Sequence, residues 1–185
     1  GVHIFEAAEN PKDGSSLATP RREKRGMRRV IRRRAQRKSQ IRQLFLKHDL
    51  SCLEAIDKKY TKTGKGIPPV SPWDLRKAGL ERKLTDEEFV KTLFHIANHR
   101  GFQSNRKGGD EPNDTDGKKA LSGAKELQDR MMRAGTRTIG AFLADQPKKR
   151  NGDGSYENFI TRPLLREEIK ALFQEQRKFG NTKAT

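Results

Sequence analysis

The side chains most able to do chemistry in this sequence are the guanidinium and ammonium groups gathered between positions 21 and 47. This stretch holds 13 basic residues against one acid, Glu23, so it carries 12 of the 17 net positive charges of the chain. Arginine outnumbers lysine here, and its planar fork can bind two oxygens of one phosphate at once. The composition therefore predicts binding of phosphate groups on a polyanion.

The same stretch has the composition of a helix. No proline interrupts it after Pro20, and Arg, Lys, Gln and Ala are good helix formers, although Gly26 weakens the helix by about 1 kcal/mol relative to alanine. We expect Thr19 to be the N-cap and Pro20 to lie in the first turn. The predicted helix spans residues 21–47.

The two sides of this helix are expected to differ in chemistry. The apolar side consists of Met27, Ile31, Ala35, Ile41 and Phe45. The basic side consists of Arg22, Arg25, Arg29, Arg32, Arg33 and Arg37, and it is widened by Arg21 and Arg28. Solvated helices usually mix both signs of charge to gain i,i+4 pairs, whereas like charges repel here. Phosphates on more than one side would remove this repulsion.

Other interpretations of a basic tract stay open, among them a nuclear-import or ribosome-type segment. A membrane-surface helix is disfavoured, because the apolar side lacks tryptophan. The sequence has no apolar run of membrane-spanning length and no signal-peptide pattern. The single cysteine, Cys52, excludes an internal disulfide and fits a reducing cytoplasm.

Catalytic constellations are not evident. His95 and His99 have the i,i+4 spacing of a metal-binding pair, but Ile96 stands where a zinc protease has glutamate, and no third ligand is apparent. A structural or RNA-facing pair is the favoured interpretation. We expect the pairs Glu87–Glu88 and Glu167–Glu168 to lie in first turns of helices, where acids interact favourably with the helix dipole. The sequence thus favours binding over catalysis.

The elements around the basic stretch predict an all-α fold. Thr85 and Glu88 form a capping-box pattern, and Gly101 is the expected end of the helix that follows. A loop is expected at 108–118. Further helices are expected at 121–134, 138–145 and 163–178, the last ended by Gly180. Behind His99 lies a basic loop with Arg100, Phe102, Arg106 and Lys107.

Several blocks of sequence resemble one known family in the family's own order. The stretch from Gly1 to Ala18, with the arginines at 21–22, 28–29, 32–34 and 37, resembles the bridge helix of type II CRISPR RNA-guided DNA endonucleases and the chain that enters it. The compact II-C subtype is the most similar. Three further blocks resemble the start of that subtype's recognition lobe. They are Pro72-Trp73-x-Leu75-Arg76, Leu84-Thr85 and His99-Arg100-Gly101-Phe102-x-Ser104-x-Arg106-Lys107. A later helix of that lobe is resembled by Phe159 and Leu172-Phe173-x-x-Gln176-x-x-Phe179-Gly180-Asn181.

The resemblance implies a division of the chain and a set of partners. Residues 1–20 would be an arm leaving the nuclease core, 21–47 the bridge helix, 48–71 a connector and 72–185 the first part of a helical recognition lobe. The partners would be guide RNA and target DNA in the heteroduplex, whose backbone and A-form shape this family binds. The location would be the bacterial cytoplasm, and no membrane would be involved.

The resemblance also implies roles for individual residues. The basic side of the bridge helix would hold guide phosphates, while Arg100, Arg106 and Lys107 would contact the repeat–anti-repeat RNA. Packing is the favoured role of Phe102 over stacking on a base. The nuclease residues would lie outside the segment, so no enzyme activity and no cofactor are expected in it, whereas the parent nuclease would use Mg²⁺. The alternatives are a docking surface for an anti-CRISPR inhibitor and an unrelated basic RNA-binding protein.

Overall fold

The computed structural model describes residues 9–10, 12–16, 18–50, 70–99, 101–103, 115–152 and 155–184. These residues form six helices and no strand, which confirms the predicted all-α fold. The helices are α1 (Ala18–Lys47), α3 (Pro72–Ala78), α4 (Asp86–Asn98), α5 (Thr115–Arg133), α6 (Ile139–Ala144) and α7 (Arg162–Lys178).

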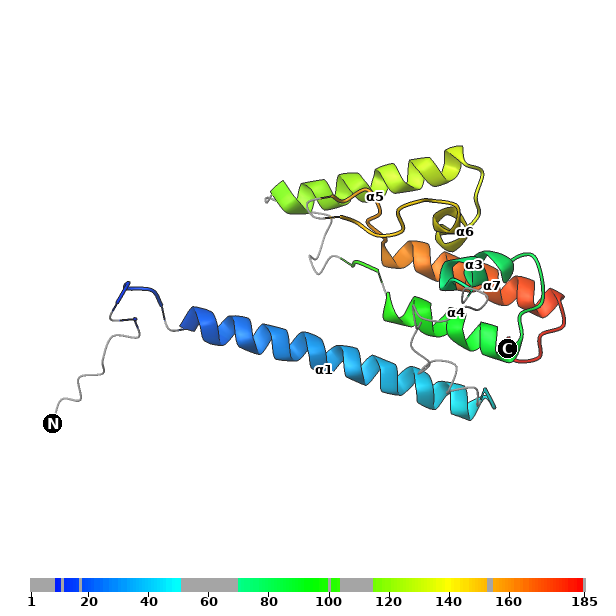
Figure 1. Ribbon diagram of the computed structural model, residues 1–185, viewed down its shortest axis with the longest axis horizontal. Coiled ribbons are helices and arrows are strands. Elements are labelled where there is room, and N and C mark those ends of the chain that lie inside the picture. The colour runs from blue at the N-terminus through cyan, green and yellow to red at the C-terminus, as the bar shows by residue number, and fades with distance from the viewer. Residues whose placement is uncertain are drawn as a thin grey trace, which may run out of the picture.

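The long helix α1 lies along one side of a small bundle. Its C-terminal part runs beside α4, the shorter helices α3 and α6 lie with α7 at the centre, and α5 lies on the side away from α1 (Figure 1). The N-terminal part of α1 projects past the end of α4 (Figure 1). At 1.5 Å per residue, the 30 residues of α1 extend about 45 Å, whereas the 13 residues of α4 extend about 20 Å.

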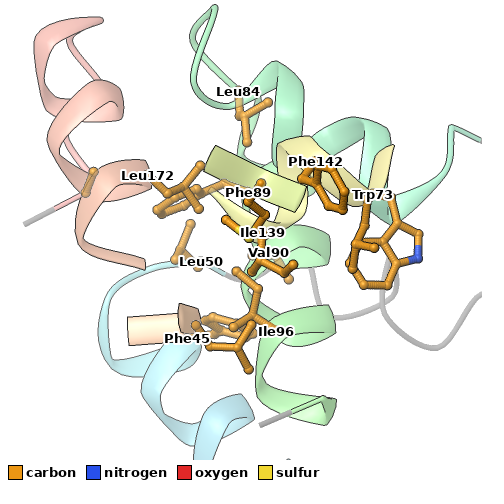
Figure 2. Close-up of a cluster of buried hydrophobic side chains, with 14 of the residues drawn as sticks. Phe45, Leu50, Trp73, Leu84, Phe89, Val90, Ile96, Ile139, Phe142 and Leu172 are labelled. Carbon is orange, nitrogen blue, oxygen red and sulfur yellow. The ribbon is translucent and has the colours of Figure 1, made fainter. Parts of the chain in front are cut away.

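The hydrophobic core takes buried side chains from all six helices, and Figure 2 shows part of it. From α1 it takes the buried Phe45, with Ile41 packed partly against it. Met27, Val30 and Ile31 are 62–66% exposed. Met27 and Ile31, which the sequence places on the apolar side of the helix, therefore do not pack against the bundle. The bundle is too short to cover more than the C-terminal part of α1.

The ends of α1 differ from the prediction at the start. The helix begins at Ala18, so Thr19 lies inside the first turn and is not the N-cap. Ser16 precedes the helix and accepts a hydrogen bond from the Ala18 N–H through its Oγ, at 3.3 Å. At the other end, the Leu50 N–H donates to the Phe45 carbonyl at 2.9 Å, with Asp49 in the left-handed region at φ 54°. A Schellman-type turn thus ends the helix without glycine.

Local signals correctly predicted the start of α4 and the end of α7. Thr85 and Glu88 form the predicted capping box, with both reciprocal hydrogen bonds present. Gly180 follows α7 at φ 75°, and the Asn181 N–H donates to the Gln176 carbonyl at 2.8 Å, which confirms the predicted stop. The loop expected at 108–118 is wrong from residue 115 on, because α5 already begins there; residues 108–114 lie outside the described residues.

Gly101 does not end α4, which stops at Asn98 with His99 as its cap. Gly101 has φ 71° and lies against the backbone of Thr161, where an added Cβ would be 2.7 Å from the carbonyl carbon. Next to it, the Phe102 N–H donates to the Ile160 carbonyl and the Arg162 N–H donates to the Phe102 carbonyl, each at 2.9 Å. The glycine therefore permits the segment after α4 to pair with the segment before α7.

Replacing Gly101 with alanine is expected to lower the free energy of unfolding by about 1–3 kcal/mol, because the side chain meets both a left-handed backbone and a close neighbour. Thermal unfolding should show a midpoint lowered by several degrees. Gly152→Ala is the matched control, since an added Cβ there has no atom within 4 Å. Equal midpoints for the two variants would contradict this role of Gly101.

A buried ion pair joins α3 to α7. The Arg76 Nε donates to Glu168 Oε1 at 2.6 Å, and Arg76 Nη2 donates to Glu168 Oε2. The guanidinium carbon lies 4.3 Å from the centre of the Trp73 ring. Gly140 of α6 packs so closely that a Cβ there would overlap the Glu168 carboxylate. Glu168 lies in the second turn of α7, so the first-turn role predicted for Glu167–Glu168 is wrong.

Candidate nucleic-acid interface

The predicted basic side of α1 is an exposed surface. Every side chain from Thr19 to Gln36 is exposed. The predicted site residues in this range are Arg21, Arg22, Arg25, Arg28, Arg29, Arg32 and Arg33. Within the described part of the chain, the structure shows no ion pair between these arginines and a carboxylate. Their guanidinium groups consequently face solvent and have no carboxylate partner among the described residues.

The spacing of these arginines makes the surface both long and wide. From Arg21 to Arg33 the helix rises about 18 Å, and these seven guanidinium groups span an arc of about 140° around it. The exposed Lys24 and Arg34 widen the basic surface to more than half of the circumference. We call these seven residues the arginine face. It can offer paired N–H donors to phosphates along its length and on several sides.

On the C-terminal side of the arginine face, α1 packs against the bundle. Arg37 and Lys38 are half-buried, and the guanidinium carbon of Arg42 lies 5.5 Å from the centre of the Phe94 ring. Such a contact stabilises the cation over the ring face. Arg37, which is also a predicted site residue, thus lies at the boundary between the arginine face and the part of α1 that contacts α4.

The two predicted histidines lie at the C-terminal end of α4, with His95 in its last turn and His99 as its cap. The His95 ring packs edge-on against Trp73 at 4.8 Å between centres, and its Nδ1 is 3.5 Å from Arg76 Nη1. The His99 Nδ1 lies 2.9 Å from the His95 carbonyl oxygen. No cluster of three or more metal-ligating side chains occurs in the described residues. These contacts favour the structural interpretation of the pair.

Burial lowers the pKa of His95 to about 3, and the positive charge of Arg76 adds to the effect. Burial also lowers the pKa of His99, with Arg150, Arg76 and Arg34 contributing. Arg34 belongs to α1, whereas Arg150 lies between α6 and α7. His99 therefore lies in the positive field of arginines from α1, from α3 and from the loop before α7.

The folded protein should lose stability as the pH falls below the ordinary histidine pKa. The unfolded chain binds a proton at His95 near pH 6.5, whereas the folded chain does not until about pH 3, so protonation favours unfolding between these values. From pH 7 to pH 5.5 the free energy of unfolding should drop by about 1 kcal/mol from this group. Urea unfolding of His95→Phe, which keeps a ring against Trp73, should show a smaller drop; an equal drop would contradict it.

Arg150 is a candidate that sequence reasoning missed. It is exposed, and it borders a shallow hollow that Trp73, His99 and Asn158 also line. Its loop is held in place, since the Asn158 side chain donates to the Lys148 carbonyl at 3.0 Å and accepts from Arg130 at 3.1 Å. The run Lys148-Lys149-Arg150 was the available signal. Lys149 itself caps the end of α6 by donating to the Ala144 carbonyl at 3.0 Å.

The other predicted contacts are placed only in part. Arg100, Arg106 and Lys107 lie outside the described residues. Phe102 is 43% exposed and packs against Phe159 at 5.0 Å between ring centres, which agrees with the packing role favoured for it.

A mainly apolar cavity lies elsewhere. It has a volume of about 390 Å³, and it lies between α1, α4 and α7 with mainly apolar residues such as Leu44, Leu93 and Ile169 around it. It offers little chemistry, so the candidate site is the charged surface and not this cavity.

Within the described residues, no helix is long and apolar enough to span a bilayer.

Comparisons with known proteins agree with this picture. No protein-family model matches the sequence. The CRISPR-associated endonuclease Cas9 of Campylobacter jejuni subsp. jejuni is 31% identical over 197 residues, which cover 97% of this chain and 19% of that protein. The crystal structure of Campylobacter jejuni Cas9 with sgRNA and target DNA matches 93% of this chain and 24% of that chain, with a TM-score of 0.66 and 24% identity.

A third match is the St1Cas9 assembly with sgRNA, target DNA and AcrIIA6, with a TM-score of 0.61 and 22% identity over 91% of this chain and 19% of that chain. In sequence and in fold the chain is therefore similar to a segment of CRISPR-associated endonucleases. It belongs to the Cas9 family, and it spans about a fifth of the length of the Campylobacter relative. The resemblance inferred from the sequence is confirmed.

Proposed function

We propose that this segment holds the guide RNA, and the RNA–DNA heteroduplex that forms on it, by their phosphate backbones. The observation that carries the proposal is the arginine face, whose charges have no carboxylate partner among the described residues. The Cas9 structures that the fold matches contain sgRNA and target DNA. A polyanion along α1 would neutralise the arginine face, and contacts with the exposed Lys24 and Arg34 would extend it around the helix.

In this proposal the parts of the chain keep the roles expected from the sequence. Residues 1–20 are the arm, 21–47 the bridge helix, 48–71 the connector and 72–185 the first part of the recognition lobe. Arg150 joins the predicted contacts, because it extends the positive surface beside His99. The segment contributes binding, while cleavage and its Mg²⁺ belong to other parts of the parent endonuclease.

Binding of labelled guide RNA to the chain, measured by fluorescence anisotropy over a range of salt concentrations, tests the proposal. If about six phosphates are engaged, the log–log salt slope should be steep, on the order of several units, because each contact releases counterions. An equal-length RNA without the repeat–anti-repeat fold is the control and should bind more weakly. Binding that is insensitive to salt would contradict the phosphate contacts.

A second candidate function is the docking of an anti-CRISPR inhibitor on the arginine face. The matched St1Cas9 assembly contains AcrIIA6, and an exposed basic surface suits an acidic protein. An acidic inhibitor should then co-elute with the chain, and guide RNA should displace it. Simultaneous binding of inhibitor and RNA would rule out docking on this face.

A further inference from the structure

The two halves of α1 are held in different ways. In the C-terminal half, Phe45 is buried, Ile41 packs on the core, and Arg42 lies on the Phe94 ring. A hydrogen-bonded turn at Leu50 closes the helix. From residue 19 to residue 36, by contrast, every side chain is exposed. Tertiary packing, which supplies most helix stability in proteins, thus supports the C-terminal half far more than the other.

Local interactions do not compensate in the N-terminal half. The first turn contains no acidic residue, although an acid there would interact favourably with the helix dipole. Gly26 interrupts the helix formers, and its neighbourhood is open space. Arg21, Arg25, Arg29 and Arg33 follow one another at i,i+4 spacing, so each turn adds a like-charge contact. This half therefore combines a helical sequence with strong self-repulsion.

We propose that residues 18–36 are a ligand-ordered half of α1, in which phosphates complete the helix that the protein alone holds weakly. The identity of the polyanion as guide RNA rests on the function proposed above, whereas the weak intrinsic stability rests on packing and charge alone. Without a polyanion, the half at 18–36 opens far more often than the half at 37–47. Anions on several sides close it by removing the repulsion between the arginines.

Hydrogen–deuterium exchange of the whole chain, read by mass spectrometry and corrected for intrinsic rates, tests the inference. At low salt and without ligand, amides at 22–36 should exchange much faster than those at 41–47. Raising the salt should slow exchange at 22–36, because screening weakens repulsion. Guide RNA at about 100 times its Kd should slow opening by up to about 100-fold, if it binds the helical state only. Comparable slow exchange in both halves at low salt would overturn the inference.

A charge-removal variant separates repulsion from other causes. Arg25→Gln, Arg29→Gln and Arg33→Gln replace three consecutive i,i+4 arginines by another good helix former. In this triple variant, exchange at 22–36 without ligand should be slower than in the parent chain, and salt should change it less. Lys119→Gln, Lys125→Gln and Arg133→Gln, on the exposed side of α5, should leave exchange in α1 unchanged. A triple variant that exchanges as fast as the parent would overturn the inference.

Inorganic polyphosphate distinguishes the ordering of α1 from the identity of its ligand. If both polyphosphate and guide RNA slow exchange at 22–36, the inference and the proposed function stand together. If polyphosphate slows exchange and guide RNA does not, the ordering by phosphate stands and guide-RNA binding fails. If neither polyanion changes exchange at 22–36, the ligand-ordered helix is ruled out.

Discussion

Replacing Glu168 with alanine is expected to lower the free energy of unfolding by about 3–5 kcal/mol, because the change leaves the Arg76 guanidinium buried without its counter-charge. The two side chains are 0% and 2% exposed, so water cannot take the place of the carboxylate. Arg76 also contacts Trp73 and lies beside His95, and these contacts tie α3, α4 and α7 to one another. Urea unfolding at neutral pH measures the change.

The matched control replaces both charges at once. Buried ion pairs exchanged for apolar residues of similar volume are often neutral or more stable. Arg76→Met with Glu168→Leu should therefore recover most of the stability that Glu168→Ala loses. If the double variant is as unstable as the single one, the loss comes from packing against Gly140 and Trp73 and not from an unpaired charge. A change below about 1 kcal/mol in Glu168→Ala would contradict the burial of the pair.

Replacing Arg29, Arg32 and Arg33 with alanine should flatten the salt dependence of guide-RNA binding. Each lost phosphate contact reduces the log–log slope by about 0.7–0.9, so three contacts amount to about 2–3 units. The fold should persist, since all three side chains are exposed and none contributes to the core. Anisotropy titrations at several salt concentrations provide the slope.

A triple variant of α5 with the same net charge as the Arg29, Arg32 and Arg33 variant shows whether the position of the removed charges matters. Lys119→Ala, Lys125→Ala and Arg133→Ala remove three exposed charges from α5, on the side of the bundle away from α1 (Figure 1). Their slope should stay close to that of the parent chain. Equal flattening in both triple variants would mean that RNA responds to total charge, and the arginine face would have no special role.

Much of the fold follows from signals that act over a few residues. Thr85 and Glu88 are three positions apart, and Gly180 needs only its neighbours to close α7, so sequence alone placed both ends. The arginine face was equally accessible, because composition and a 100° period determine which side chains share a side of a helix. Local chemistry is readable wherever the partners are close in sequence.

Contacts between residues far apart in the sequence could not be predicted from the sequence in this way. Glu168 and Arg76 are 92 positions apart, so the sequence did not indicate their ion pair. Because Glu167 and Glu168 are adjacent acids near the start of a helix, they were predicted to interact with the helix dipole instead. The extent of packing on α1 could not be predicted from the sequence for a related reason. The pattern of apolar residues reaches Met27, but the length of α4 determines how much of that pattern has a partner.

The central claim is that guide RNA is held by the arginine face of α1, and arginine-specific chemical modification tests it most directly. The chain would be treated with phenylglyoxal, with and without guide RNA, and modified arginines located by mass spectrometry. We predict strong protection at Arg22, Arg25, Arg29, Arg32 and Arg33, and none at Arg133, which is also exposed. Protection that is equal at Arg133 and at the arginine face, or absent from α1, would contradict it.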